Sequence, residues 1–263
     1  MTATFNGQQA AVVVAGARSL GASHPLLDWG LPGGRFFTQA NGQPLGASNT
    51  GFAVTDAEGI GFWSAYERYG GSDALGYPIS HRFQWRGSVV QLTQRALLQW
   101  WPETSEARLA NLLDDLHDAG LDGRLVRERL IPHQMPNDGE VGLTFQQVAA
   151  RRLGLLDADP AIRKRYFESP DPQREFGLPT SPVVDLGPVV VVRTQRGALQ
   201  RWKTVMPWAR PGDVTVVLAG DVARELGLFG SPTAPFAPEE APAPQTFVPW
   251  ARLHKNLAQE DSL

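Results

Sequence analysis

Short apolar runs separated by turn residues dominate two parts of the chain. The first group of runs comprises Phe83–Trp85, Val89–Gln94 and Leu97–Trp101. The second group comprises Val183–Val184, Val189–Gln195 and Ala198–Trp202. Short runs rich in valine and aromatic residues and bounded by turn signals are typical of β-strands. Each group therefore predicts a small antiparallel meander.

A helix is expected immediately before each meander. Thr55 and Glu58 have the spacing of a capping box, in which each residue satisfies a backbone group at the helix start. The segment after them carries four aromatic residues at helical spacing: Phe62, Trp63, Tyr66 and Tyr69. Before the second meander, Asp159 is suited to cap a helix that begins at Pro160.

The two groups are copies of one unit, which we call the first repeat (Leu75–Glu103) and the second repeat (Phe176–Lys203). A shift of 101 positions places Gly76 on Gly177 without any gap. Eleven of the 27 residues from Leu75 to Trp101 are then identical in the second repeat: Gly76, Pro78, Ser80, Val89, Val90, Thr93, Gln94, Arg95, Leu98, Gln99 and Trp101. This agreement is far beyond chance, so the chain contains an internal duplication.

A helical insert is expected between the repeats, and a tail after them. Four leucines recur at the spacing of an amphipathic helix: Leu109, Leu112, Leu113 and Leu116. Thr144 and Gln147 form a further capping-box pattern at the start of a second helix. From Gly230 onward the chain is rich in proline, which favours an extended linker or tail.

These elements predict an α+β fold, built from two helix-plus-meander units with a helical insert and a proline-rich C-terminal tail. The expected divisions are residues 1–50, an N-terminal segment with a weak partial copy of the repeat; 51–103, the first repeat unit; 104–158, the insert; 159–229, the second repeat unit with a closing strand and helix; and 230–263, the tail.

Composition excludes several classes of function. The net charge of −3 is unlike that of a general nucleic-acid binder, and the absence of cysteine excludes disulfides and thiolate metal sites. No apolar run reaches the roughly 20 residues of a transmembrane helix. The run Ala10–Ala17 lacks a basic region before it and is short for a signal peptide. The five histidines show no metal-ligand spacing, and we expect no cofactor, metal site or catalytic motif.

The repeat resembles the LGFP repeat of bacterial envelope-associated and secreted proteins. Leu75-Gly76-Tyr77-Pro78 and Phe176-Gly177-Leu178-Pro179 carry the resemblance, together with the strands that end at Trp101 and Trp202. Repeats of that family usually succeed one another at about half the spacing found here, and the insert departs from their pattern. The resemblance implies an extracellular or cell-surface location and a non-catalytic binding or anchoring role.

Candidate ligand-binding residues are those that could contact a sugar through amide, guanidinium or aromatic groups: Tyr77, Gln94, Arg95, Trp100, Gln195 and Arg196. Alternatively, the glutamines satisfy backbone groups at a turn while the arginines pair at the surface. Trp101 and Trp202 are expected in the core because both repeats retain this tryptophan. Trp100 is replaced by Arg201 in the second repeat, so we expect Trp100 to be exposed and available to a ligand.

Three functions are compatible with this pattern. The first is a non-catalytic envelope or extracellular module that binds a cell-wall or surface polysaccharide, without nucleic-acid partners. The second is a structural protein that assembles with copies of itself. The third is a hydrolase whose site is assembled from residues distant in sequence, since one fold can host unrelated functions.

Overall fold

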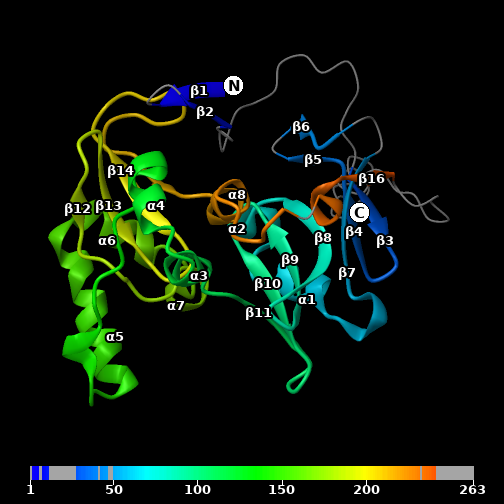
Figure 1. Cartoon of the computed structure of the whole chain (residues 1–263), viewed down its shortest axis with the longest axis horizontal. Coiled ribbons are helices and arrows are strands. Elements are labelled where there is room, and N and C mark those ends of the chain that lie inside the picture. Colours follow the sequence, from blue (N-terminus) through cyan, green and yellow to red (C-terminus); the bar gives the residue numbers. More distant parts are fainter. Residues whose placement is uncertain are drawn as a thin grey trace, which may run out of the picture. The chain divides into compact units, whose positions relative to one another are not determined.

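The computed structural model of the chain describes residues 2–5, 8–11, 28–40, 42–46, 50–231 and 233–240. Two compact units are present, and each contains one repeat (Figure 1). The first-repeat unit comprises Ala15–Arg108 and Ser231–Leu263, and the second-repeat unit comprises Met1–Val14 and Leu109–Gly230. Both units combine helices with antiparallel strands, which confirms the expected α+β class.

The first repeat folds as the expected helix and meander. Two short helices precede its strands, α1 (Phe62–Arg68) and α2 (Gly71–Leu75). The strands are β8 (Pro78–Trp85), β9 (Ser88–Thr93), β10 (Leu97–Trp101) and β11 (Glu106–Leu109), in the sheet order β11-β10-β9-β8. Helix α1 buries Phe62 and Tyr66 of the aromatic stripe, while Trp63 and Tyr69 are half-buried.

A second sheet in the first-repeat unit is built from segments that flank the repeat. It contains β3 (Trp29–Leu31), β4 (Gly34–Phe37), β7 (Thr50–Thr55) and β16 (Glu239–Glu240), in the order β16-β7-β4-β3. Nearby lie the two-stranded pair β5 (Gln39–Ala40) and β6 (Gln43–Pro44) and the short helix η1 (Ala57–Gly59). The buried side chains of this sheet are mainly aromatic, and they include Trp29, Phe36, Phe37 and Phe52.

The beginning of the expected tail packs on this unit. The ring of Phe236, in η4 (Ala234–Phe236), lies 5.6 Å from the ring of Phe83, and β16 pairs with β7. These contacts differ from the extended tail that the proline content predicts. They arise because Phe236 and the two residues of β16 have an apolar surface and a strand edge to pair with. Residues 241–263 of the expected tail lie outside the described part of the chain.

The second repeat has the same order of elements. Helices α6 (Pro160–Phe167) and α7 (Pro172–Glu175) precede β12 (Val184–Asp185), β13 (Val189–Arg193), β14 (Ala198–Trp202) and β15 (Val214–Val216). These four strands form a sheet in sequence order. One apolar cluster joins α6 to the sheet through Leu156, Ile162, Tyr166, Phe176, Val190, Val192 and Leu199.

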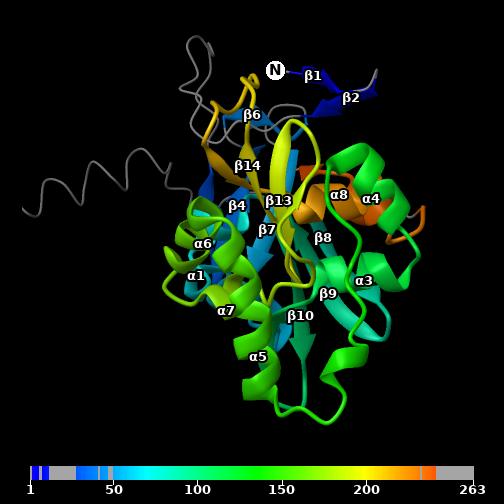
Figure 2. The same cartoon turned by 90° about the vertical axis from the view of Figure 1, so that its left-hand side faces the viewer.

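The helices of the insert belong to the second-repeat unit. They are α3 (Leu112–Asp118), α4 (Asp122–Arg129), η2 (Asp138–Glu140), α5 (Phe145–Gly154) and η3 (Leu155–Ala158). The unit also contains α8 (Ala219–Glu225) and the hairpin of β1 (Thr2–Phe5) and β2 (Gln8–Ala11). In Figure 2, α6 and α7 lie on one side of β13 and β14, and α3 and α4 lie on the other.

Two of the three expected helix caps are confirmed. Asp159 accepts hydrogen bonds from the first turn of α6, and Thr144 and Gln147 form a complete capping box on α5. The capping box at Thr55 was wrong, because Thr55 is the last residue of β7 and pairs with Gly34 of β4. Helix α1 starts seven residues later, after Gly61. The amphipathic helix likewise begins at Leu112, since Leu109 ends β11.

Candidate functional site

The duplicated glutamine serves the same turn in both repeats. The side-chain oxygen of Gln94 accepts a hydrogen bond of 3.1 Å from the backbone N–H of Tyr77. In the second repeat, Gln195 accepts from Leu178 at 3.0 Å. A buried backbone N–H without a partner is costly, so each glutamine stabilises the turn that joins the helix to the meander.

The glycine of this turn is required for two reasons. The φ angles of Gly76 and Gly177 are 73° and 74°, a region that side chains of L-residues rarely adopt. A Cβ at Gly76 would also lie 2.7 Å from the Cβ of Gln94, and one at Gly177 would lie 2.7 Å from that of Gln195. Both repeats therefore keep the glycine and the glutamine together, because the glutamine side chain packs directly against the glycine.

A tyrosine completes the turn, and the gapless comparison of the repeats missed it. The hydroxyl of Tyr66 donates to the carbonyl of Gly76 at 2.9 Å, and that of Tyr166 donates to Gly177 at 2.8 Å. Burial raises the pKa of both phenols above the usual value. The tyrosines are 100 positions apart and the glycines 101, so an alignment that allowed one gap would have paired them.

The duplicated arginine closes the short helix before the turn. Arg95 donates to the carbonyl of Asp73 at 2.6 Å, and Arg196 donates to that of Gln173 at 2.7 Å. The structure thus gathers Tyr77, Gln94 and Arg95 at one turn, and Gln195 with Arg196 at the other. The two glutamines bond the turn backbone, as in the alternative interpretation, and both arginines donate to backbone carbonyls of the helix before the turn. Trp100 lies elsewhere.

Trp101 and Trp202 differ in a way that the sequence did not predict. Trp202 is buried, as expected: its indole N–H donates to Thr215 at 2.9 Å and its ring meets Trp208 edge to face at 5.5 Å. The core position predicted for Trp101 was wrong, because 41% of it is exposed. Trp208 belongs to the loop of the second-repeat unit between β14 and β15. The first repeat has instead a four-residue turn from β10 to β11, too short to cover the indole.

An open groove of about 480 Å³ lies at Trp101 in the first-repeat unit. Its walls come from the turn between β8 and β9 with the start of β9, the end of β10, the turn that follows β10, and one residue of β11: Gly87, Ser88, Val89, Gln99, Trp100, Trp101, Pro102, Glu103, Thr104 and Arg108. Trp100 is the member of the predicted ligand-binding set that lines it. Trp100 is half-buried, and one of its ring carbons lies 3.6 Å from the position that a Cβ on Gly61 would take. Trp101 is therefore the more exposed of the two tryptophans that line the groove.

Gln99 and Gln200 occupy the same position in the two repeats, and their contacts show that the chain covers this position in the second repeat but leaves it open at the groove. Gln200 donates to the carbonyls of Arg129 and Leu130, at the end of α4, at 2.9 and 3.1 Å. Its counterpart Gln99 is half-buried, donates to the hydroxyl of Ser88 at 3.0 Å and lines the groove. In the second-repeat unit, the chain itself thus supplies carbonyl oxygens and apolar side chains to the same position of the repeat.

Arg108 supplies the positive charge in the groove. Its guanidinium group lies 5.3 Å from the centre of the Trp101 ring, within the range of a cation–π contact. Arg108 Nε pairs with Glu106 at 3.0 Å, while the other carboxylate oxygen of Glu106 lies 3.3 Å from Arg68. Glu103 also lines the groove. The site combines an aromatic face with amide, hydroxyl, guanidinium and carboxylate groups.

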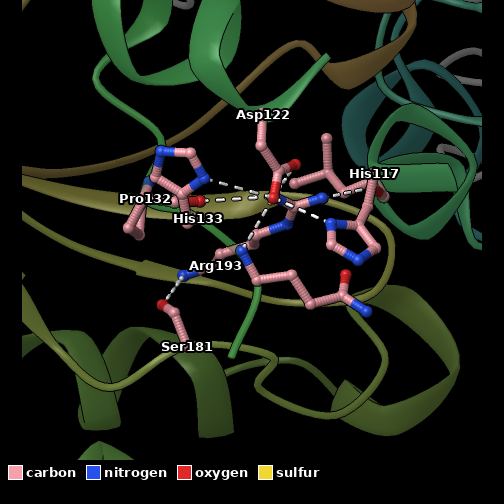
Figure 3. A network of polar contacts seen from close by, with 8 residues as sticks. His117, Asp122, Pro132, His133, Ser181 and Arg193 are labelled. Atoms are coloured by element: carbon pink, nitrogen blue, oxygen red, sulfur yellow. Dashed lines mark hydrogen bonds and ion pairs between the residues drawn. The ribbon is translucent and has the colours of Figure 1, made fainter. Parts of the chain in front are cut away.

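A polar network in the second-repeat unit is centred on Arg193, which is completely buried (Figure 3). Arg193 occupies the position of Leu92 in the first repeat. Its guanidinium pairs with Asp122 of α4 at 2.7 Å, and donates to the carbonyls of Pro132 at 3.2 Å and of Leu113 in α3. These bonds fasten the insert to β13, which is a structural role.

Two histidines flank the carboxylate of this network. Nδ1 of His117 is 2.8 Å from Oδ2 of Asp122, and Nδ1 of His133 is 3.6 Å from the same oxygen (Figure 3). Burial alone would raise the pKa of Asp122, but hydrogen bonds from Arg193, His117 and the backbone of Gln134 outweigh it and hold the pKa below its usual value. Sequence spacing gave no sign of this network, in which Arg193 bonds residues 71 and 80 positions away.

Within the described residues, no group of three or more histidine, aspartate or glutamate side chains is arranged to hold a metal ion. No helix among them is long and apolar enough to cross a membrane. The sequence matches no family model, and a search of the curated proteins finds no match to it.

Proposed function

We propose that this protein is a non-catalytic module of the bacterial cell envelope or exterior, and that it binds a surface glycan in the groove at Trp101. The observation that carries the proposal is the exposed indole at a position that the second repeat covers with its own chain. The LGFP-like turns, which motivate the envelope setting, serve as scaffold in this proposal.

The chemistry of the groove suits a sugar ring. An indole offers a large, flat apolar surface, and the C–H face of a pyranose packs on such a surface. Around it, Gln99, Ser88 and Thr104 offer amide and hydroxyl groups for sugar hydroxyls. Pockets that bind small ligands commonly combine apolar walls with a few polar groups that fix orientation. The volume of about 480 Å³ is sufficient for one or two sugar rings.

Binding rather than cleavage is favoured by the carboxylates. Glycosidases commonly use two carboxyl groups on either side of the scissile bond. Glu103 is the one acidic side chain among those that line the groove, and Glu106 beside it is paired with two arginines. Incubation of a bound polymer with the protein should therefore release no new reducing ends. Their release at a rate that Glu103→Gln abolishes would contradict the non-catalytic part of the proposal.

Retention on insoluble polymers tests the binding itself. Wild-type protein is mixed with purified bacterial cell wall and with a panel of insoluble polysaccharides, and the unbound fraction is measured. We expect retention on at least one polymer and its loss in Trp101→Ala, with a smaller loss in Trp101→Phe. Phe145→Ala is the matched control, because Phe145 is an exposed aromatic residue of the second-repeat unit that lies outside the groove.

Two outcomes would overturn the proposal. One is that wild-type protein is retained on no polymer of the panel. The other is that Trp101→Ala is retained as strongly as the wild type. Circular dichroism and thermal unfolding of each variant show whether it is folded, so that a loss of binding is not confused with a loss of structure.

A further inference from the structure

We infer that the groove at Trp101 selects a saccharide that carries a carboxylate, such as a uronic acid residue. The inference rests on the proposed function, because it names the class of glycan that the same groove would take. Its basis is the guanidinium of Arg108, which lies beside the aromatic face.

The first step is the charge balance around Arg108. Glu106 bridges Arg68 and Arg108, with one carboxylate oxygen toward each. Its single negative charge balances one of the two guanidinium charges. Arg108 lines the groove while Arg68 does not, so a ligand at the groove would meet a guanidinium group that shares its carboxylate partner with a second arginine. Glu103 also lines the groove, where its carboxylate can accept hydrogen bonds from the hydroxyl groups of a sugar.

The second step is the hydrogen-bonding capacity of Arg108. Its Nε is bonded to Glu106, and one Nη donates to Thr104 at 3.4 Å. Among the described residues, none accepts a hydrogen bond from the other Nη. A guanidinium group is a fork of donors that matches a carboxylate and forms bonds about twice as strong as those between neutral groups. A carboxylate is therefore the ligand group that best completes the bonds of Arg108.

The third step is geometry. The guanidinium lies 5.3 Å from the centre of the Trp101 ring. A uronic acid carries its carboxylate directly on the pyranose ring, so a sugar packed on Trp101 would place that group within a few ångströms of Arg108. The ion pair of Arg108 with Glu106 also holds the guanidinium in place, which lowers the entropy lost on binding.

The experiment compares acidic polymers with matched neutral ones. Polygalacturonate, alginate and hyaluronan are each used beside a carboxyl-reduced preparation of the same polymer, in which –COO⁻ has become –CH₂OH. We expect the wild type to bind at least one acidic polymer about tenfold more tightly than its reduced form. Arg108→Gln should remove this difference, and added salt should weaken binding of the acidic polymer alone, because ions screen exposed charges.

Arg163→Gln is the matched control. Arg163 also pairs with a carboxylate, that of Asp157, and lies 5.0 Å from the centre of an aromatic ring, that of Phe167, but it is in the second-repeat unit. This variant should keep the wild-type preference, which would show that loss of an arbitrary surface arginine does not explain the effect.

Each remaining outcome counts against the inference. Equal binding of acidic and reduced polymers would overturn it and leave glycan binding intact. A preference that survives in Arg108→Gln would also overturn it, because the carboxylate would then be recognised elsewhere. If the protein binds cell wall but none of the six polymers, selection of a carboxylate is contradicted. If it binds neither cell wall nor any of the polymers, the proposed glycan-binding function is contradicted as well.

Discussion

Trp101 and Trp202 occupy the same position in the two repeats, yet 41% of Trp101 is exposed and only 5% of Trp202. The difference comes from the segments that leave β10 and β14. Trp202 is covered by Trp208 and neighbouring apolar residues, whereas the chain turns directly into β11 after Trp101. Duplication has thus preserved the residue while its surroundings changed. The exposed copy is the one we assign to a ligand.

Replacing each tryptophan by alanine should separate these two environments. Trp202→Ala should lower the free energy of unfolding by about 3–5 kcal/mol, the usual cost of deleting a buried aromatic side chain. Trp101→Ala should lower it by about 1 kcal/mol or less, since substitutions at exposed positions have small effects. Urea unfolding followed by tryptophan fluorescence measures both. Equal losses would show that Trp101 is part of a core.

The identical residues of the two repeats predicted the duplicated helix-and-meander fold correctly, but they wrongly predicted that Trp101 is buried. The reason is physical. A residue shared by both copies reports what the strand and its turn require, such as Gly76 with Gln94. It does not report which loop covers the strand afterwards, because the covering residues of the second repeat have no aligned partner in the first. The groove therefore could not be predicted, although Trp100 at its wall was singled out by the difference between the copies.

The turn glycine provides a second prediction. Gly177→Ala should lower the free energy of unfolding by about 2–3 kcal/mol, because it adds a steric clash to the strain of a positive φ. The added Cβ would lie 2.7 Å from that of Gln195. Chemical denaturation provides the measurement.

Gly187→Ala is the control for strain alone. Gly187 has a φ of 89°, and nothing lies within 4 Å of its added Cβ. This variant should cost only about 1–2 kcal/mol, the usual penalty of a left-handed conformation. Equal losses in Gly177→Ala and Gly187→Ala would contradict the argument that close packing against the glutamine requires a glycine at this turn.

The buried ion pair yields a third prediction. Arg193→Leu introduces the residue that the first repeat has at this position, Leu92, but it leaves the carboxylate of Asp122 without its main partner. We expect a loss of about 3–5 kcal/mol, as is usual when one member of a buried pair is removed. The double variant Asp122→Asn/Arg193→Leu should lose less than the sum of the two single variants. Additive losses in this double-mutant cycle would show that the two residues act independently.

The Asp122–Arg193 pair shows why the contact between the insert and β13 could not be predicted from the sequence. Asp122 precedes a glycine on a short helix with several charged residues, and a solvated face is the ordinary interpretation of such a pattern. Its partner is 71 positions away, in a strand that is otherwise all valine. An arginine at the end of a buried strand is the available signal, since a buried charge requires a partner. The pattern does not say which of many acidic residues that partner is.

A fourth prediction concerns pH. Burial, with a smaller contribution from Glu225, raises the pKa of Asp221 in α8 to about 7, while Arg224 opposes the shift. A carboxyl group with a raised pKa favours the folded state when protonated. The protonated Asp221 carboxyl group contributes fully to the stability of the folded state below the pKa of an unfolded aspartate, about 4. This contribution is lost as the pH rises through the folded-state pKa of about 7. Asp221→Asn stays neutral, so its unfolding free energy should fall less than that of the wild type between pH 5 and pH 8.

Asp185→Asn is the control for this pH dependence. The hydrogen bond from Lys203, with one from the backbone of Gly187, lowers the pKa of Asp185. A lowered carboxyl pKa gives the opposite sign: the stabilisation is present above the unfolded pKa and is lost as the pH falls through the folded one. That transition lies below pH 5, so Asp185→Asn should keep the wild-type slope between pH 5 and pH 8. Urea unfolding at several pH values measures all three proteins, and equal slopes for Asp221→Asn and the wild type would show that Asp221 is already ionised at pH 5.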